Sequence, residues 1–497
     1  MNKLPLELAS IIAVDLDIVS LGSLRQASKL TNSLFSPVFL QYFRSQRVDL
    51  TRSGLKRLCG LASSPALRSA VSSLTLVCLY YHNDPWYDQK HLAALQNPSF
   101  QDPRAAASEY ARLCRRNREW IAEQRDEQNL FMGEDMLCML ADCLRHLKNV
   151  RHVSLEASVV HGADLIKVPE EVASLRWREL WTGAIQGYRI LLMAIARSGA
   201  LLDSLHIYQL TKKCSIPTHE IVEPLSLFSA AERENFANFA AHLKDFSISL
   251  ATTTLPVRPR PGTHASWEEM IDLDPYGAFD ISHGSNLHAS DGHVDALADM
   301  EGVARLLQAM PNLESLHIHL CTTVNGILVR GYYQHFLSTI FLGGWVFRRL
   351  SQLTLRGLQA SQQDLYDILA RHIPQLRILG LENITLNSGS WNPVFDLLRC
   401  EARSLEKLRL SALWCPDSDG NRMNLAPIDK SRDIDDVADF LDWEEAINGE
   451  RIWYTRNIKG EEVRGPDGLQ FRPMVESFGD PVKASWYVRH RAEYGPL

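Results

Sequence analysis

A short hydrophobic pattern recurs along most of the chain and limits the folds open to it. Each copy has an apolar residue, two variable residues and then an apolar-x-apolar end, as in "VSSLTL" from Val71 to Leu76. Further copies read "VRHVSL", "LDSLHI", "LKDFSI", "LESLHI", "LSQLTL", "LRILGL" and "LEKLRL", the last of which ends at Leu410. The alternating end of each copy predicts a β-strand with one buried face.

Helical patterns stand before most of these predicted strands. Examples are "EDMLCMLADCLRHL", "GYRILLMAIARSG", "QDLYDILARHI" and "NPVFDLLRCEA". Alternation of helix and strand is typical of a parallel sheet or a solenoid, so the sequence predicts an α/β fold. The pattern over residues 48–415 resembles an irregular leucine-rich repeat. The alternative is an ordinary α/β domain whose strands happen to start with leucine.

The resemblance to a leucine-rich repeat implies that each repeat buries its apolar side against its neighbours. The residues expected to point inward are Leu316, Ile318, Leu353, Leu355, Leu379 and Leu381. The residues expected on the other, concave face of the sheet are His206, Tyr208, His317, His319, Thr354, Arg356, Glu382 and Arg409. Because tyrosine and arginine are enriched at interface hot spots, this face is predicted to bind a target protein.

Two insertions and a tail interrupt the repeat pattern. The insertion at about 83–130 ends in a stretch that predicts a long charged helix, and the one at about 251–292 is rich in Pro, Gly, Ser and Thr, which predicts a loop. Residues 416–497 form an acidic tail with several tryptophans, including a predicted hairpin in "ERIWYTRNIKGEEVRGPDGLQFRP". We expect this tail to cap the last repeat, although an independent partner-binding segment is the alternative.

The N-terminal segment, residues 1–47, predicts three short helices. Leu4, Leu8 and Ile11 lie on one stripe of the first helix, which Pro5 can start. Asp17 or Ser20 can cap the second helix, and the pair "SP" at 36–37 is the expected start of the third. Such a unit is too small to bury its apolar surface alone, so it must pack on the rest of the chain, on a partner, or on both.

The order of residues in this segment resembles an F-box in the form common in fungal proteins. The matching positions are Leu4, Pro5, Glu7, Ile11, Leu16, Leu21, Leu24, Arg25, Ser28, Lys29, Leu34, Pro37 and Phe43. The resemblance implies docking onto the Skp-type adaptor of a cullin–RING ubiquitin ligase, with Leu4, Pro5, Leu8 and Leu24 at or near the adaptor surface. A tryptophan near the end of the motif, found in many animal F-boxes, is missing here. The alternative is a helical cap that only covers the first repeat.

Composition narrows the classes of partner. The net charge of −7 gives no general attraction to nucleic acid or to an anionic membrane. Glu7 interrupts the segment where a signal peptide would be most apolar, and no stretch has the roughly 20 uncharged residues of a membrane span. The nine cysteines are scattered, which favours reduced thiols over a disulfide framework. We therefore expect a cytoplasmic or nuclear protein that is not secreted.

A search for catalytic motifs finds no nucleophile elbow, phosphate-binding loop, zinc-protease motif or dinucleotide fingerprint. His317 and His319 share a strand face, but a zinc site usually needs four ligands, so we expect polar surface positions there. No catalytic residue, metal or cofactor is predicted. An enzyme with an unrecognised pocket is a third hypothesis.

These observations favour a non-catalytic substrate receptor of a Skp–cullin–F-box type ubiquitin ligase. The N-terminal helices would bind the adaptor, and the repeat region would bind a target protein. The alternative is a leucine-rich-repeat interaction scaffold without a role in ubiquitin ligation.

Overall fold

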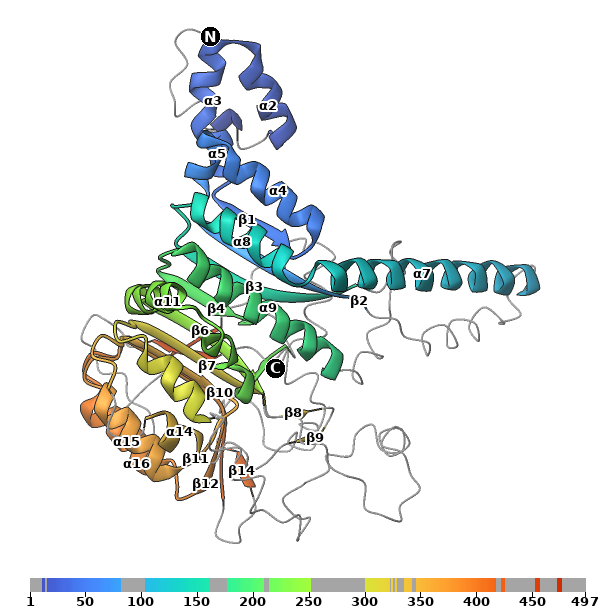
Figure 1. Ribbon diagram of the computed structural model, residues 1–497. Coiled ribbons are helices and arrows are strands. Elements are labelled where there is room, and N and C mark those ends of the chain that lie inside the picture. The colour runs from blue at the N-terminus through green and yellow to red at the C-terminus, as the bar shows by residue number, and fades with distance from the viewer. Residues whose placement is uncertain are drawn as a thin grey trace.

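The fold of the chain is given by a computed structural model (Figure 1). The described residues are 11–13, 16–81, 103–160, 177–209, 214–251, 300–321, 323–324, 327–328, 335–341, 346–416, 422–424, 452–455 and 472–475. Leu4, Pro5 and Leu8 lie outside this part of the chain, as does the predicted loop after Ala251. Among the described helices, none combines the length and apolar character needed to cross a lipid bilayer.

A mostly parallel β-sheet runs through the molecule, with its strands side by side in the order of the sequence. Its parallel strands are β1 (Ser45–Asp49), β2 (Ser73–Tyr81), β3 (His152–Val160), β4 (Ser204–Ile207), β6 (Asp245–Ala251), β7 (Ser315–Cys321), β10 (Gln352–Arg356), β12 (Ile378–Ser388) and β13 (Lys407–Pro416). Short strands β5 (Ile216–Pro217) and β11 (Gln359–Ser361) pair with β6 and β12. The predicted α/β class with a parallel sheet is therefore confirmed.

Helices line one face of this sheet (Figure 1). They are α4 (Arg52–Ser63), α5 (Pro65–Ala70), α8 (Glu134–His146), α9 (Trp177–Ser198), α10 (Glu223–Ser226), α11 (Ala230–His242), α14 (Phe336–Ile340), α15 (Gln362–His372) and α16 (Asn392–Glu401), with a 3-10 turn η2 (Thr218–Glu220) and a helical stretch at 300–308. Along the first half of the sheet α4, α8, α9 and α11 contact one another in that order, and α14, α15 and α16 do so farther along.

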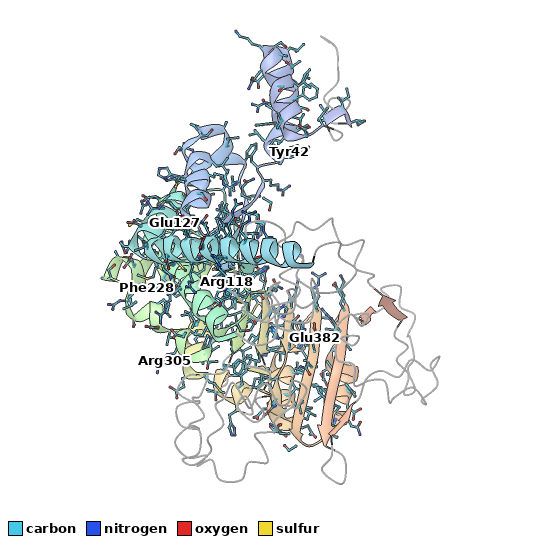
Figure 2. All side chains as sticks on the ribbon, turned by 90° about the vertical axis from the view of Figure 1, so that its right-hand side faces the viewer. Tyr42, Arg118, Glu127, Phe228, Arg305 and Glu382 are labelled. Atoms are coloured by element: carbon cyan, nitrogen blue, oxygen red, sulfur yellow. The ribbon has the colours of Figure 1, made fainter. Side chains whose placement is uncertain are left out.

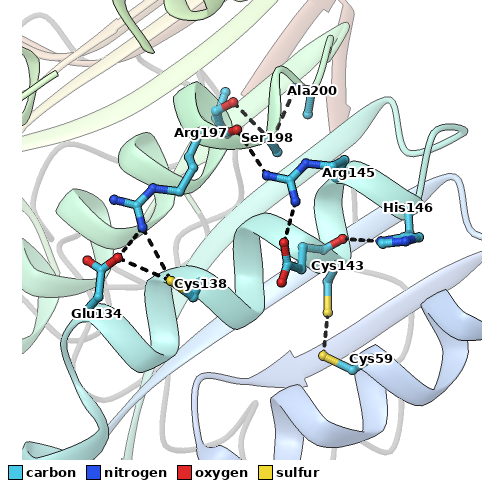
Figure 3. Close-up of polar contacts among 11 residues, drawn as sticks. Cys59, Glu134, Cys138, Cys143, Arg145, His146, Arg197, Ser198 and Ala200 are labelled. Atoms are coloured by element: carbon cyan, nitrogen blue, oxygen red, sulfur yellow. Dashed lines mark hydrogen bonds and ion pairs between the residues drawn. The ribbon is translucent and has the colours of Figure 1, made fainter. Parts of the chain in front are cut away.

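The helices of this row begin where the sequence supplies caps. Ser229 and Glu232 form a capping box at the start of α11, and the hydroxyl of Ser361 accepts the Asp364 N–H at the start of α15. Ion pairs then join neighbouring helices. The guanidinium of Arg197 on α9 pairs with Glu134 on α8, as Figure 3 shows, and with Glu232 on α11.

The core lies between the sheet and this helix row. The inward strand positions form two continuous rows across the sheet, one of which passes through Leu316, Leu353 and Leu379. All six residues that the repeat pattern placed inward, from Leu316 to Leu381, are at most 1% exposed. Their burial confirms the alternation predicted from the pattern, because successive strand residues point to opposite faces.

A tight turn after β10 depends on glycine. Gly357 has a φ of +73°, a conformation that costs other residues about 1–2 kcal/mol. Its N–H donates to the carbonyl oxygen of Glu382 at 3.0 Å, and a Cβ there would lie 2.0 Å from the carbonyl oxygen of Leu320. The turn therefore lets the backbone pass close to both neighbouring strands.

The first insertion and the C-terminal tail add elements at the sides of the sheet. The insertion ends in the predicted long helix, α7 (Pro103–Phe131), which stands out from the sheet in Figure 1. After β13, β14 (Arg422–Asn424) and β15 (Ile452–Thr455) pair with it antiparallel, and β16 (Arg472–Val475) pairs with β15. The antiparallel pair β15–β16 is the predicted hairpin. A separate antiparallel pair is formed by β8 (Thr323–Val324) and β9 (Ile327–Leu328).

The N-terminal helices differ in one detail from the sequence prediction. Helix α2 (Ile18–Ala27) is capped by Asp17, whose carboxylate accepts the Ser20 N–H at 2.6 Å. Helix α3 (Lys29–Gln41) begins after Ser28, so the prediction that Pro37 starts the third helix is wrong. The hydroxyl of Ser28 caps this earlier start, and burial of Phe35 and Val38 on both sides of the proline holds it within the helix.

Candidate protein-binding surfaces

The N-terminal helices form a small unit with its own core. Ala13, Leu21, Phe35 and Val38 are buried together, apart from the main core. The main contact of α3 with the body is made through α5, and Figure 1 shows the unit standing at the end of the molecule beyond β1. Most of its surface is therefore turned away from the sheet.

This unit displays many of the exposed large apolar side chains in the described part of the chain. Ten large apolar residues are exposed in the described part of the protein, and six of them lie within residues 11–42, about one tenth of that part. The six are Ile11, Ile12, Ile18, Val19, Leu30 and Tyr42. Val19 is the most open of them, at 75% exposed. Single exposed apolar side chains are common, but a concentration of them marks an interaction site.

Of the four residues predicted to bind the adaptor, the described structure contains only Leu24. Its side chain is half-buried and packs against the small core of Leu21 and Phe35. It therefore helps to hold α2 against α3, and part of it remains on the surface. Ile18, Val19 and Leu30 were not predicted from the sequence as part of this surface. Each lies one or two residues after a helix N-cap, Asp17 or Ser28, and this position was the signal that could have found them.

The second candidate surface is the sheet face opposite the helix row, here called the open face. Register places His206, Ser247, His317 and Thr354 side by side in one row of this face. A neighbouring row contains Ser249, His319, Arg356 and Glu382. Six of the eight residues predicted on the concave face therefore lie in adjacent rows, and Arg409 continues the first row beyond Gly380.

Tyr208 does not belong to this face, which corrects the sequence prediction. Its backbone has a positive φ of 56°, so the alternation of β4 ends at Ile207. The tyrosine side chain is fully buried, and its hydroxyl donates to the carbonyl oxygen of Ala184 on α9 at 2.8 Å. Tyr208 thus joins the core on the helix side.

His206 is held by two neighbours on the open face. Its Nε2 lies 2.7 Å from Oδ2 of Asp245 and 3.0 Å from Oγ of Ser204, and the serine hydroxyl also donates to Asp245 at 2.9 Å. Burial raises the pKa of Asp245, but hydrogen bonds from His206, Ser315 and Ser204 outweigh it and hold the pKa below its ordinary value.

This arrangement has the residue types of a catalytic triad without its geometry. In a triad the hydroxyl and the carboxylate contact opposite ring nitrogens, so that the imidazole can take a proton from one side while the acid orients the other. Here both Ser204 and Asp245 contact Nε2 of His206. The three groups therefore act as a hydrogen-bonded polar cluster on the sheet.

The other two histidines are also held by neighbours. Nδ1 of His317 lies 3.1 Å from the side-chain amide of Gln209, and Nδ1 of His319 lies 3.1 Å from the hydroxyl of Ser249. Within the described ranges no group of three or more His, Cys, Asp or Glu side chains is placed to hold a metal ion.

A charged cluster lies farther along the open face. Arg409 Nη1 is 2.9 Å from Glu382 Oε1, and Arg356 Nε is 3.9 Å from Glu382 Oε2. Glu382 and Arg409 are only 6% and 7% exposed. Figure 2 shows Glu382 on the strands, well away from Tyr42 at the base of the N-terminal helices. The open face and the N-terminal apolar surface are thus two separate regions.

Glu156 occupies the same kind of position but was not predicted from the sequence. Glu156 is 4% exposed and pairs with Arg47 on β1 at 3.3 Å. It directly follows the apolar-x-apolar end of its copy, as Glu382 and His319 follow theirs. The rule that selected those two residues would also have selected Glu156.

Comparisons with known proteins add no relative to this picture. No protein-family model matches the sequence, and no curated protein matches it either.

Proposed function

We propose that this chain is a non-catalytic substrate receptor of a Skp–cullin–F-box type ubiquitin ligase. Its N-terminal helices are proposed to bind the adaptor, and the open face of the sheet is proposed to bind a target protein. The observation that carries the proposal is the concentration of exposed apolar side chains within residues 11–42.

The build of the N-terminal unit supports adaptor binding. Its helices are tied together by four buried residues, while Ile18, Val19 and Leu30 are exposed. A partner that covered these side chains would remove apolar area from water, worth roughly 25 cal/mol for each Å². Because the segment resembles an F-box, we propose that this partner is a Skp-type adaptor.

The order of the strands supports the proposal of an irregular leucine-rich-repeat-like solenoid. Each helix–strand unit contacts the next one in sequence, as stacked repeats do. Among the described residues, such stacking leaves one long sheet face without a helix layer. On this face Glu382 pairs with the buried Arg409 and with Arg356, whose side chain is 23% exposed and is the part of the cluster that a partner could reach. A cluster with charges of both signs favours binding of a partner with a complementary charge pattern over non-specific binding.

The mechanism follows from the separation of the two surfaces. The adaptor would hold the N-terminal end within the ligase, and the sheet would hold the target some distance away (Figure 1). A target held in this way meets the activated ubiquitin at a raised effective concentration, and other subunits supply the chemistry.

Binding of a purified Skp-type adaptor to the full chain tests the proposal. Val19→Asp places a charge in the exposed apolar surface, and we expect at least about tenfold weaker binding because that charge would be desolvated without a partner. Val19 lies in the first turn of α2, where an acidic residue favours the helix. The variant should therefore keep the fold of the unit.

Leu227→Asp is the matched control, since Leu227 is also apolar and 60% exposed but lies at the end of α10. We expect this variant to bind the adaptor as the wild type does. An adaptor that ignores the wild-type chain, or that binds Val19→Asp equally well, would overturn the receptor proposal and leave the interaction scaffold as the better account.

A further inference from the structure

The contacts that join helix α7 to the body in the described part of the chain come from its C-terminal half. Ile121 is 2% exposed, and the ring of Trp120 meets Tyr81 of β2 edge-on at 6.0 Å. Gln128 donates from Nε2 to the carbonyl oxygen of Leu79 at 3.0 Å, and Phe131 is buried in the main core. Residues 119–131 are thus fixed to the side of the sheet.

The N-terminal half of α7 extends beyond the strands (Figure 1). Residues 103–118 span roughly 24 Å at 1.5 Å per residue. Arg112, Arg115, Arg116 and Arg118 are exposed there, and Figure 2 shows Arg118 and Glu127 along the helix. Arg115 and Arg116 are adjacent in the chain, and no ion pair joins either of them to another described residue.

The two halves of α7 have opposite charge. Residues 103–118 have five arginines against one glutamate, a formal charge of +4, and residues 119–131 have four acidic residues against one arginine, −3. The arginine-rich half is the half that projects from the body, so its positive charge is presented to solvent and to partners outside the chain (Figure 1).

We propose that the projecting half of α7 is a docking surface for an acidic segment of the target protein, a role that rests on the proposed receptor function. Arg112, Arg115 and Arg116 lie at i, i+3 and i+4, on one side of the helix, so carboxylates of one extended segment can reach all three. Arginine binds carboxylates with two parallel hydrogen bonds, which adds direction to the attraction.

The charge of the neighbouring surface favours an acidic protein segment over nucleic acid. Glu119, Glu123, Asp126 and Glu127 follow directly after the arginines, and the whole chain has a net charge of −7. A nucleic acid lying along α7 would bring phosphates onto this acidic half. A short acidic segment can end at Arg116 and run toward residue 103, so that most of its carboxylates lie more than a Debye length of about 8–10 Å from the acidic half.

Fluorescence anisotropy with a labelled peptide of about eight glutamates tests the proposal on the full chain, since such a peptide spans roughly 27 Å when extended. We expect the double variant Arg115→Glu with Arg116→Glu to weaken peptide binding by about tenfold or more, since two attractions become repulsions. The matched control is Arg348→Glu with Arg349→Glu, two adjacent exposed arginines elsewhere on the chain. It makes the same change in net charge and should leave the affinity unchanged.

Peptide binding by the wild type, its loss in the α7 variant and its persistence in the control support the proposal. Absence of binding, or an equal loss in both variants, overturns it. Tighter binding of single-stranded DNA of about eight nucleotides, or of phosphatidylserine vesicles, through the same arginines also overturns it. Adaptor binding is measured on the same proteins and should not change, so failure of this proposal and failure of the receptor proposal give different results.

Discussion

Phe35→Ala is expected to unfold the N-terminal unit while the sheet stays folded. Phe35 is 1% exposed and is the largest of the four buried residues in that unit. Replacing a buried phenylalanine with alanine costs about 3–5 kcal/mol. A unit of fewer than about 40 residues is only marginally stable by itself, so this cost should exceed what holds α2 and α3 together.

Amide hydrogen exchange on the full chain, followed by mass spectrometry, measures the effect region by region. Each 1.4 kcal/mol corresponds to a factor of ten, so exchange in residues 18–41 should accelerate by roughly a hundredfold to several thousandfold, or until it reaches the unprotected rate. Strands β10 and β12 should exchange as in the wild type. Their core shares no buried residue with the N-terminal unit.

Phe347→Ala is the reciprocal control. Phe347 is also 1% exposed, but its ring contacts Phe341 and His372 in the main core. This variant should destabilise the sheet and leave α2 and α3 protected. The reasoning is refuted if Phe35→Ala accelerates exchange in the sheet as much as in residues 18–41, because the two parts would then unfold as one.

Two further changes test the body. Gly357→Ala should lower the free energy of unfolding by about 2–5 kcal/mol in denaturant titration, because it combines a left-handed φ with a Cβ 2.0 Å from the Leu320 carbonyl oxygen. An unfolding midpoint equal to that of the wild type would contradict this. Burial lowers the pKa of His372, against a hydrogen bond to the Ile368 carbonyl that raises it. Below about pH 6.5 the unfolded chain therefore binds a proton that the folded chain resists, so stability is full above that pH and falls below it. Thermal unfolding at about pH 7.5 and pH 5.5 should show a smaller loss in His372→Gln than in the wild type, and an equal loss would remove His372 as the cause.

Hydrophobic alternation was enough to predict the strands and their buried side. Leu353 and Leu355 alternate with Thr354 because one face of β10 meets the helix row, and the same argument holds for Leu316 and Ile318 on β7. The charged helix of the first insertion was also predictable, because it contains long charged runs without glycine or proline after its start. Local patterns of this kind need no knowledge of distant contacts.

Features that depend on distant contacts or on a single backbone angle could not be predicted from local sequence patterns. The positive φ of Tyr208 turned a predicted surface residue into the core. The contact of His206 with Asp245 depends on the register between β4 and β6, which no local pattern states. Pro37 looked like a helix start, but Ser28 offered an earlier cap and burial of Phe35 extended the helix through it.

The central claim is that residues 11–42 form a surface for a Skp-type adaptor, and hydrogen exchange of the full chain with and without that adaptor tests it most directly. The account predicts slower exchange in α2 and α3 on adding the adaptor, with no change in α15 or α16. Unchanged exchange in α2 and α3 at saturating adaptor, or protection confined to the open face of the sheet, would contradict it.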